Sequence, residues 1–204
     1  MTREKEIQIR SITNKLETRA EQDGELYLEG YFAVFNTLTE LWPGAYEEID
    51  PTAFDKTLGN DIRALINHNT EMVIGRNKAN TLELKADSHG LWGKIKINQK
   101  DTDAMNAYAR VERGDISGNS FGFNIIAEET EYRDDGTVKW RITEIDLHEV
   151  SVATFPQYPK TNIQARKKEV EQHKERQLEL RKSKLKERLD NVKAINVTEK
   201  DTNI

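Results

Sequence analysis

Apolar and polar residues alternate in short runs through the first 160 residues, and a period of two is typical of β-strands with one buried face. Turn-forming sequences separate the runs, among them Asp134-Asp135-Gly136, which predicts a hairpin. The expected strands are Glu6–Ser11, Glu25–Phe35, Ile62–Asn67, Thr81–Lys85, Leu91–Asn98, Phe121–Glu128, Val138–Ile145 and Val150–Phe155. This pattern predicts a mainly β (α+β) domain in the form of a small closed or nearly closed β-barrel.

Two short helices are expected to interrupt the strands. Asp50 followed by proline is typical of an N-cap and the first helical position, and it predicts a helix over Pro51–Leu58. Asp101 or Thr102 can cap a second helix that runs to about Arg113, where a glycine ends it. We expect both helices at the rim of the barrel.

The composition changes after residue 164. Ala165–Val197 contains neither proline nor glycine and is rich in Lys, Arg, Glu and Gln. Aliphatic residues recur there at heptad spacing, although sparsely: Leu178, Leu185 and Val192, with Leu189 beside them. We therefore expect a β domain over residues 1–164 and a charged tail over 165–204, which is helical or disordered and pairs weakly at most.

Charge and composition exclude several classes of function. Residues 1–164 carry a net charge of −9 and the tail carries +4, so the body is a poor surface for nucleic acid. Cysteine is absent and no two histidines have metal-ligand spacing, so we expect neither a metal nor a cofactor. No run of about 18 apolar residues suggests a membrane span, and the N-terminus lacks a signal peptide's apolar stretch. A soluble, cytoplasmic protein is expected.

The strongest local signal for chemistry is Gly118–Gly122 (GNSFG). Glycines two residues to either side of Ser120 allow a sharp turn, which exposes the hydroxyl and frees nearby amides for an oxyanion. Ser117 is a competing nucleophile without this glycine pair, and an ordinary turn before a strand is the alternative interpretation. An α/β-hydrolase elbow is excluded, because that fold needs a helix after the serine and Phe121–Glu128 alternates like a strand.

Two of the four histidines could act as a general base. His68 ends an apolar strand, where its ring can leave the edge of the core while its backbone stays fixed. His148 lies in a strand that also carries several polar groups. His89 lies in a turn and His173 in the charged tail, and both are expected to be solvated. For His68 and His148, a surface or half-buried structural histidine is the alternative.

A catalytic triad also needs a group that orients the imidazole. Three downstream residues could be that group: Asp146, His148 and Glu149. Strand alternation puts Asp146 and His148 on one face, and Glu149 on the other face together with Ser151. Glu149 interrupts a run of apolar or small residues. A buried carboxylate there is unfavourable unless a partner satisfies it, and a histidine N–H would do so.

Six sequence strings follow one another along roughly Leu26 to Ala165, nearly the whole acidic body: Gly30–Asn36, Tyr46–Phe54, Ala64–Asn69, Gly75-Arg76, Gly114–Phe123 and Glu144–Pro159. This ordered set resembles the prohead (procapsid maturation) proteases of tailed double-stranded-DNA phages, which are distantly similar in fold to herpesvirus assemblin. The chain departs from the family at Gln157, where the family often has alanine.

The resemblance implies residue roles. Ser120 would be the nucleophile, His68 the general base and Glu149 the third member of the triad. Backbone amides at Ser120 to Gly122 would hold the oxyanion. Assemblin uses a second histidine as the third member, so His148 stays a rival for that role.

The resemblance also implies a function. The chain would be a serine endopeptidase that cleaves scaffold protein, or the scaffolding segment of the major capsid protein, and itself during capsid maturation. It would act in the host cytoplasm inside the immature capsid, with the tail as a tether to scaffold that self-cleavage removes. The family resemblance allows a homodimer, and neither nucleic acid nor a membrane is expected as partner. The alternatives are a non-catalytic capsid-assembly or tail-tube structural protein, and a small esterase with the same triad.

Overall fold

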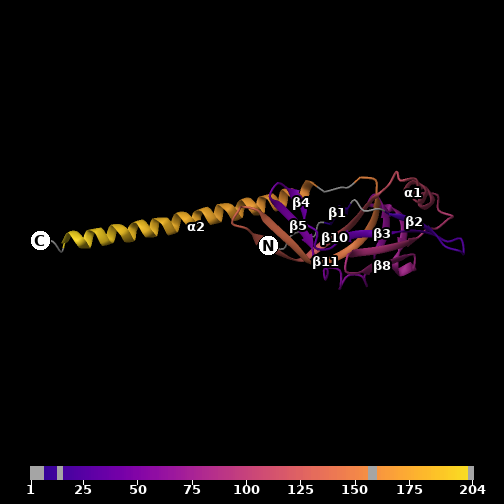
Figure 1. Cartoon of the computed structure of the whole chain (residues 1–204), viewed down its shortest axis with the longest axis horizontal. Helices are drawn as coiled ribbons and strands as arrows, with labels where there is room; N and C mark the ends of the chain where they lie inside the picture. The colour runs from indigo at the N-terminus through magenta and orange to yellow at the C-terminus, as the bar shows by residue number, and fades with distance from the viewer. Residues whose placement is uncertain (1–6, 13–15, 156–159, 202–204) are drawn as a thin grey trace. The chain divides into compact units, whose positions relative to one another are not determined.

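The structure is a computed structural model that describes residues 7–12, 16–155 and 160–201, with side chains described for 166–188 of the last range. The described residues form eleven strands, two α-helices and a short 3-10 helix, η1 (Asn77–Ala79). The chain divides into two compact units, Met1–Pro159 and Lys160–Ile204 (Figure 1).

The first unit contains a seven-stranded sheet with the order β1-β10-β11-β5-β4, in which β6 also pairs with β11 and β7 pairs with β6. Its strands are β1 (Gln8–Ile12), β4 (Thr39–Trp42), β5 (Ala45–Ile49), β6 (Arg63–Ile66), β7 (Asn69–Arg76), β10 (Gly118–Tyr132) and β11 (Val138–Ala153). The long β10 and β11 form an antiparallel pair that runs through the unit (Figure 1). β5 and β6 both run parallel to β11, β5 along its beginning and β6 along its end.

The second sheet has four antiparallel strands in the order β2-β3-β9-β8. They are β2 (Glu17–Ala20), β3 (Leu26–Val34), β8 (Leu82–Ala86) and β9 (Gly90–Lys96). The barrel prediction is wrong, because the described strands pair into two separate sheets and no described pairing closes either of them. Closure is not needed to bury the apolar faces, since two sheets can cover each other's inner face.

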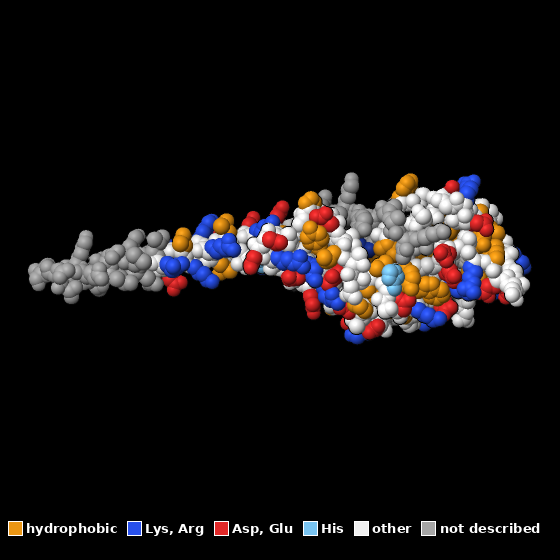
Figure 2. All heavy atoms as spheres, in the orientation of Figure 1, with side chains coloured by type: hydrophobic (Ala, Val, Ile, Leu, Met, Phe, Trp, Pro, Cys, Tyr) orange, Lys and Arg blue, Asp and Glu red, His pale blue; other side chains and the backbone are white. Residues whose placement is uncertain are grey.

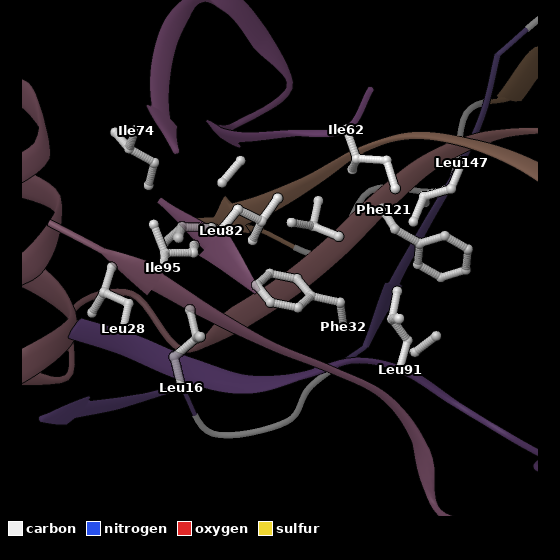
Figure 3. Close-up of a cluster of buried hydrophobic side chains, with 14 of the residues drawn as sticks. Leu16, Leu28, Phe32, Ile62, Ile74, Leu82, Leu91, Ile95, Phe121 and Leu147 are labelled. Carbon is white, nitrogen blue, oxygen red and sulfur yellow. The ribbon is translucent and has the colours of Figure 1, made fainter. Parts of the chain in front are cut away.

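One hydrophobic cluster takes side chains from both sheets. Phe32, Leu28 and Ile95 come from the four-stranded sheet, and Phe121 and Leu147 come from β10 and β11 (Figure 3). The two phenylalanines of β10 stack with ring centroids 4.8 Å apart. Apolar side chains thus fill one face of β10, which leaves its other face, with Ser120, free for polar groups.

Local signals predicted two features correctly. The Asp134–Gly136 hairpin is present between β10 and β11, with Gly136 at φ 84°. Helix α1 (Thr102–Arg113) begins after Asp101, whose side chain accepts hydrogen bonds from the amides of residues 103 and 104. It ends at Gly114, which is left-handed at φ 87°.

The helix predicted over Pro51–Leu58 is wrong, because this segment is a series of turns. Its main-chain bonds are of the i to i+3 kind, such as Thr57 N to Phe54 O at 3.1 Å. Strand β11 hydrogen-bonds two oxygen atoms of this segment. Ile145 N donates to Ala53 O, a main-chain acceptor that an α-helix would use, at 3.1 Å. Leu147 N donates to Thr57 Oγ1 at 2.7 Å. Bonds to the sheet therefore replace the helical ladder.

The second unit is the single helix α2 (Lys160–Asp201). Lys, Arg, Asp and Glu side chains alternate with hydrophobic ones along its described part (Figure 2). Leu178, Leu180 and Leu185 are each more than half exposed. Pro156–Pro159 and the side chains of Leu189 and Val192, on which part of the prediction rested, lie outside the described residues. No described helix is long and apolar enough to cross a bilayer.

A buried ion pair ties β1 to β5. Arg10 is 6% exposed and Glu47 3%. Arg10 Nη2 donates to Glu47 Oε2 at 2.8 Å, and its Nε donates to the other carboxylate oxygen. This bidentate pair connects two strands that are not neighbours in the sheet order, so it fixes β1 on the unit.

Glu47→Ala is expected to lower the free energy of unfolding by about 3–5 kcal/mol, because Arg10 would remain buried without its counter-charge. The measurement is urea unfolding followed by tryptophan fluorescence, since the three tryptophans all lie before Pro159. The control is the double variant Arg10→Met with Glu47→Leu, which removes both charges and is expected to lose much less. A single variant as stable as wild type would contradict this role of the pair.

Candidate active site

His68 lies in the tight turn of the β6–β7 hairpin. Ile66 pairs with Asn69, so the loop consists of Asn67 and His68, and both are left-handed at φ 50° and 61°. Two successive left-handed residues define a type I′ turn, whose preferred sequence is Asn-Gly. Histidine stands where glycine is expected. A side chain in this conformation is strained by about 1–2 kcal/mol, and such strain persists chiefly at functional positions.

The turn is fastened to the end of β11. Asn67 N donates to Val152 O at 2.9 Å, and Asn67 Oδ1 accepts from Thr154 N at 2.8 Å. At the other end of the hairpin Arg76 donates to Asp61, which lowers the pKa of that carboxyl to about 2. The backbone of His68 is therefore fixed at both ends of the hairpin, while its ring projects from the tip.

The strain at this turn predicts a stability difference between two variants. His68→Gly and His68→Ala lose the same imidazole, and they differ in their tolerance of a left-handed backbone. The glycine variant is expected to be more stable than the alanine variant by about 1 kcal/mol. Urea unfolding followed by tryptophan fluorescence gives the difference. Equal stabilities, or a more stable alanine variant, would mean that the turn is not strained.

Glu149 is the partner of His68. The residue is 8% exposed, and its Oε1 lies 2.7 Å from His68 Nδ1. A β-bulge places it there: Gly122 pairs with Glu149 and Phe123 pairs with Leu147, so His148 has no partner residue in β10. Gly122 provides the space, because a Cβ built on it would lie 2.3 Å from Glu149 Oε1.

The rival residues are engaged elsewhere. His148 Nε2 hydrogen-bonds Asn124 Oδ1, and Asp146 Oδ1 accepts from Asn60 Nδ2 at 2.9 Å. Among the described residues, the His68 ring has one hydrogen-bond partner, Glu149. The structure thus pairs the predicted base with Glu149 rather than with His148 or Asp146.

Ser120 lies within β10, and the predicted exposed turn at this serine is wrong. The residue is fully buried and pairs with Ser11 on β1 and with Ser151 on β11. The glycine pair allows close approach rather than a turn: a Cβ on Gly118 would lie 2.6 Å from Ala153 O. Because β10 is paired on both sides here, the amides of Ser120 to Gly122 belong to the sheet and are not free for an oxyanion.

Ser120 shares a face of the sheet with the histidine–glutamate pair. Directly paired residues on antiparallel strands project to the same side of the sheet, so Ser120 lies beside Ser151. The Ser151 hydroxyl forms hydrogen bonds with the main-chain N of His68 and with the carboxylate of Glu149. The Ser120 hydroxyl donates to Arg10 O at 2.8 Å and accepts from Ser11 Oγ at 2.9 Å. His68 Nε2 is buried, and no described residue hydrogen-bonds it. The Ser120 hydroxyl therefore faces β1, and none of the described side chains donates a hydrogen bond to this nitrogen of the base.

Sequence reasoning missed the roles of three residues at this site. Ser11 and Arg10 hydrogen-bond the Ser120 hydroxyl from 109 and 110 residues away in the sequence, and no local pattern marks them. Ser151 was expected on the Glu149 face, but not as a partner of both His68 and Glu149. Ser117, the rival nucleophile, is exposed and precedes β10.

Comparison with known proteins finds a matching family, a similar phage protein and a similar solved structure. The family model described as caudovirus prohead serine protease matches residues 14–176. The prohead protease of Enterobacteria phage HK97 is 29% identical over 143 residues, which are 68% of this chain and 59% of that protein. The chain thus spans less than two thirds of that relative's length. The solved bacteriophage T4 capsid assembly protease covers 72% of this chain and 96% of its own, at 10% identity and a TM-score of 0.48.

Proposed function

Because the chain belongs to the caudovirus prohead serine protease family, we propose that it is a serine endopeptidase in which Ser120 is the nucleophile, His68 the general base and Glu149 the residue that orients the base. The order along the chain is base, nucleophile, acid. Triads are defined by geometry, and several chain orders occur.

The observation that carries this proposal is the His68–Glu149 pair with its unused nitrogen. Nδ1 is 2.7 Å from an oxygen of the buried Glu149, and a carboxylate oxygen can only accept, so Nδ1 donates to it. In the neutral imidazole, Nε2 is then the acceptor. A buried polar atom without a partner is unfavourable by about 1–3 kcal/mol. Such an atom fits a base that receives its partner, the Ser120 hydroxyl, when that side chain changes rotamer.

The reaction would proceed by acyl transfer. His68 Nε2 accepts the Ser120 proton as Oγ attacks a peptide carbonyl, and Glu149 stabilises the imidazolium. The imidazolium then gives that proton to the leaving amine, and the acyl group stays on Ser120 as an ester. Water hydrolyses the ester with His68 again as base. Since the amides of Ser120 to Gly122 are paired in the sheet, other donors must stabilise the oxyanion.

The proposed substrates are the scaffold protein or the scaffolding segment of the major capsid protein, and the chain itself. The HK97 relative is a prohead protease, which supports an action inside the immature capsid in the host. Helix α2, with charges of both signs and exposed leucines, would tether the enzyme to scaffold and be removed by self-cleavage.

The test is incubation of the purified full-length chain with the scaffold-bearing capsid protein of its phage, and in parallel with a p-nitrophenyl ester. Mass spectrometry is expected to find the capsid protein and the chain itself cut at discrete positions. Ester turnover with an intact capsid protein would indicate a small esterase. No reaction in either assay would contradict an enzyme, and would leave a structural assembly protein.

A further inference from the structure

Ser151 connects the two halves of the His68–Glu149 pair. It is fully buried in β11, directly opposite Ser120. Its hydroxyl donates to Glu149 Oε2 at 2.6 Å and accepts from the main-chain N of His68 at 3.1 Å. A single hydroxyl therefore holds both the carboxylate that orients the ring and the strained turn that carries it.

The hydrogen bonds around this hydroxyl allow one arrangement. Serine has one proton to donate, and it goes to Glu149, so the oxygen can only accept from His68 N. The two oxygens of Glu149 are then divided: Oε1 bonds the imidazole and Oε2 bonds Ser151. Without the hydroxyl, the carboxylate could rotate about its terminal bond, and the His68 amide would lose its acceptor.

We propose that Ser151 is a positioning residue, which aims the His68 imidazole at the nucleophile by fixing both Glu149 and the Asn67–His68 turn. This role rests on the proposed function, because it requires His68 to act as the base. A misplacement of a catalytic group by about 1 Å can lower a rate by roughly 10²-fold. Loss of the Ser151 hydroxyl is therefore expected to lower the reaction rate measurably, without any contact between Ser151 and substrate.

The test uses the full-length chain, its Ser151→Ala and Ser151→Thr variants, and a fluorophosphonate as the probe of nucleophile reactivity. Intact-mass spectrometry gives the rate at which Ser120 is labelled. Ser151→Ala is expected to label roughly 10- to 100-fold more slowly than wild type. Ser151→Thr keeps the hydroxyl and is expected to recover most of the rate. A wild-type rate in Ser151→Ala would overturn the proposal.

A second readout separates positioning from loss of structure. The proton between His68 Nδ1 and Glu149 should give a low-field proton NMR signal, in wild type and equally in Ser120→Ala. Ser151→Ala is expected to lose or broaden this signal while its tryptophan fluorescence stays native. An unchanged NMR signal in Ser151→Ala would contradict the role of Ser151, whether or not wild type is labelled. If the wild-type protein is not labelled at all, that result counts against the proposed function and not against the role of Ser151.

An independent observation concerns β1 and the nucleophile itself. The only proton of the Ser120 hydroxyl goes to Arg10 O, and its oxygen accepts from Ser11. Both partners lie on β1, which the buried Arg10–Glu47 pair fixes in place. We infer that β1 holds Ser120 in a resting orientation, and that the hydroxyl must turn from β1 to His68 Nε2 before it can attack. This inference also rests on the proposed function.

The test is the rate of fluorophosphonate labelling in Ser11→Ala and in Ser11→Thr. Ser11→Ala removes one of the two bonds that hold the resting hydroxyl, so labelling is expected to be roughly two- to ten-fold faster than wild type. Ser11→Thr keeps that bond and should label at the wild-type rate. If Ser11→Ala labels at the wild-type rate or more slowly, β1 does not restrain the nucleophile. If Ser11→Ala is labelled and wild type is not, the restraint of Ser120 by β1 is supported.

Discussion

Ser120→Ala and His68→Ala are each expected to reduce cleavage of the capsid protein by about 10⁴–10⁶-fold, because either change removes a member of a unit that acts together. The rate is measured by gel densitometry and mass spectrometry of the capsid protein at a fixed enzyme concentration. Tryptophan fluorescence of each variant shows whether the first unit is still folded.

Two matched controls accompany this prediction. Ser117→Ala removes an exposed hydroxyl three residues from Ser120, and His148→Ala removes the histidine next to Glu149. Both are expected to stay within about ten-fold of wild type, since neither residue bonds His68. Loss of activity in Ser117→Ala with full activity in Ser120→Ala would move the nucleophile to Ser117.

Glu149→Gln is expected to lower kcat/KM by roughly 10⁴-fold. The amide has nearly the shape of the carboxylate, so the strand and the bulge should be kept. It has no charge to stabilise the imidazolium, and an amide NH₂ turned toward Nδ1 would select the wrong tautomer. The measurement is the rate of cleavage of a peptide that spans a mapped cut site.

The control for this prediction is Glu144→Gln on the same strand. Glu144 is partly exposed and pairs with Lys56 at 2.7 Å, so its loss should not change the rate measurably. An active Glu149→Gln together with an inactive His148→Ala would assign the third position to His148 instead.

Features encoded by neighbouring residues were predictable from the sequence. Both ends of helix α1 were predicted, because its N-cap Asp101 and its terminating Gly114 are directly adjacent to it in the sequence. The Asp134–Gly136 hairpin has the same local origin. The segment after Asp50 was misjudged although its local signals are equally clear, because Ile145 and Leu147 of β11 take its bonding groups. A bond to a strand about 90 residues away leaves no local trace.

In the candidate site, too, locally encoded features could be predicted, and features set by distant strands could not. The pairing of Glu149 with a histidine could be inferred because a carboxylate in an apolar run needs a partner, and the structure provides His68 as that partner. The glycines around Ser120 were recognised, but their reason was not: they admit the Ala153 carbonyl and the Glu149 carboxylate rather than forming a turn. Strand register decides this, and the sequence does not reveal register across 30 residues. Barrel closure failed as a prediction for the same reason.

The most direct test of the central claim is peptide mapping of the full-length chain after reaction with a fluorophosphonate, together with Ser120→Ala and His68→Ala. We predict a single phosphonyl group on Ser120 in wild type, none in Ser120→Ala, and strongly slowed labelling in His68→Ala. Labelling of another residue, or labelling of Ser120 at the same rate without His68, would contradict a serine protease built from Ser120, His68 and Glu149.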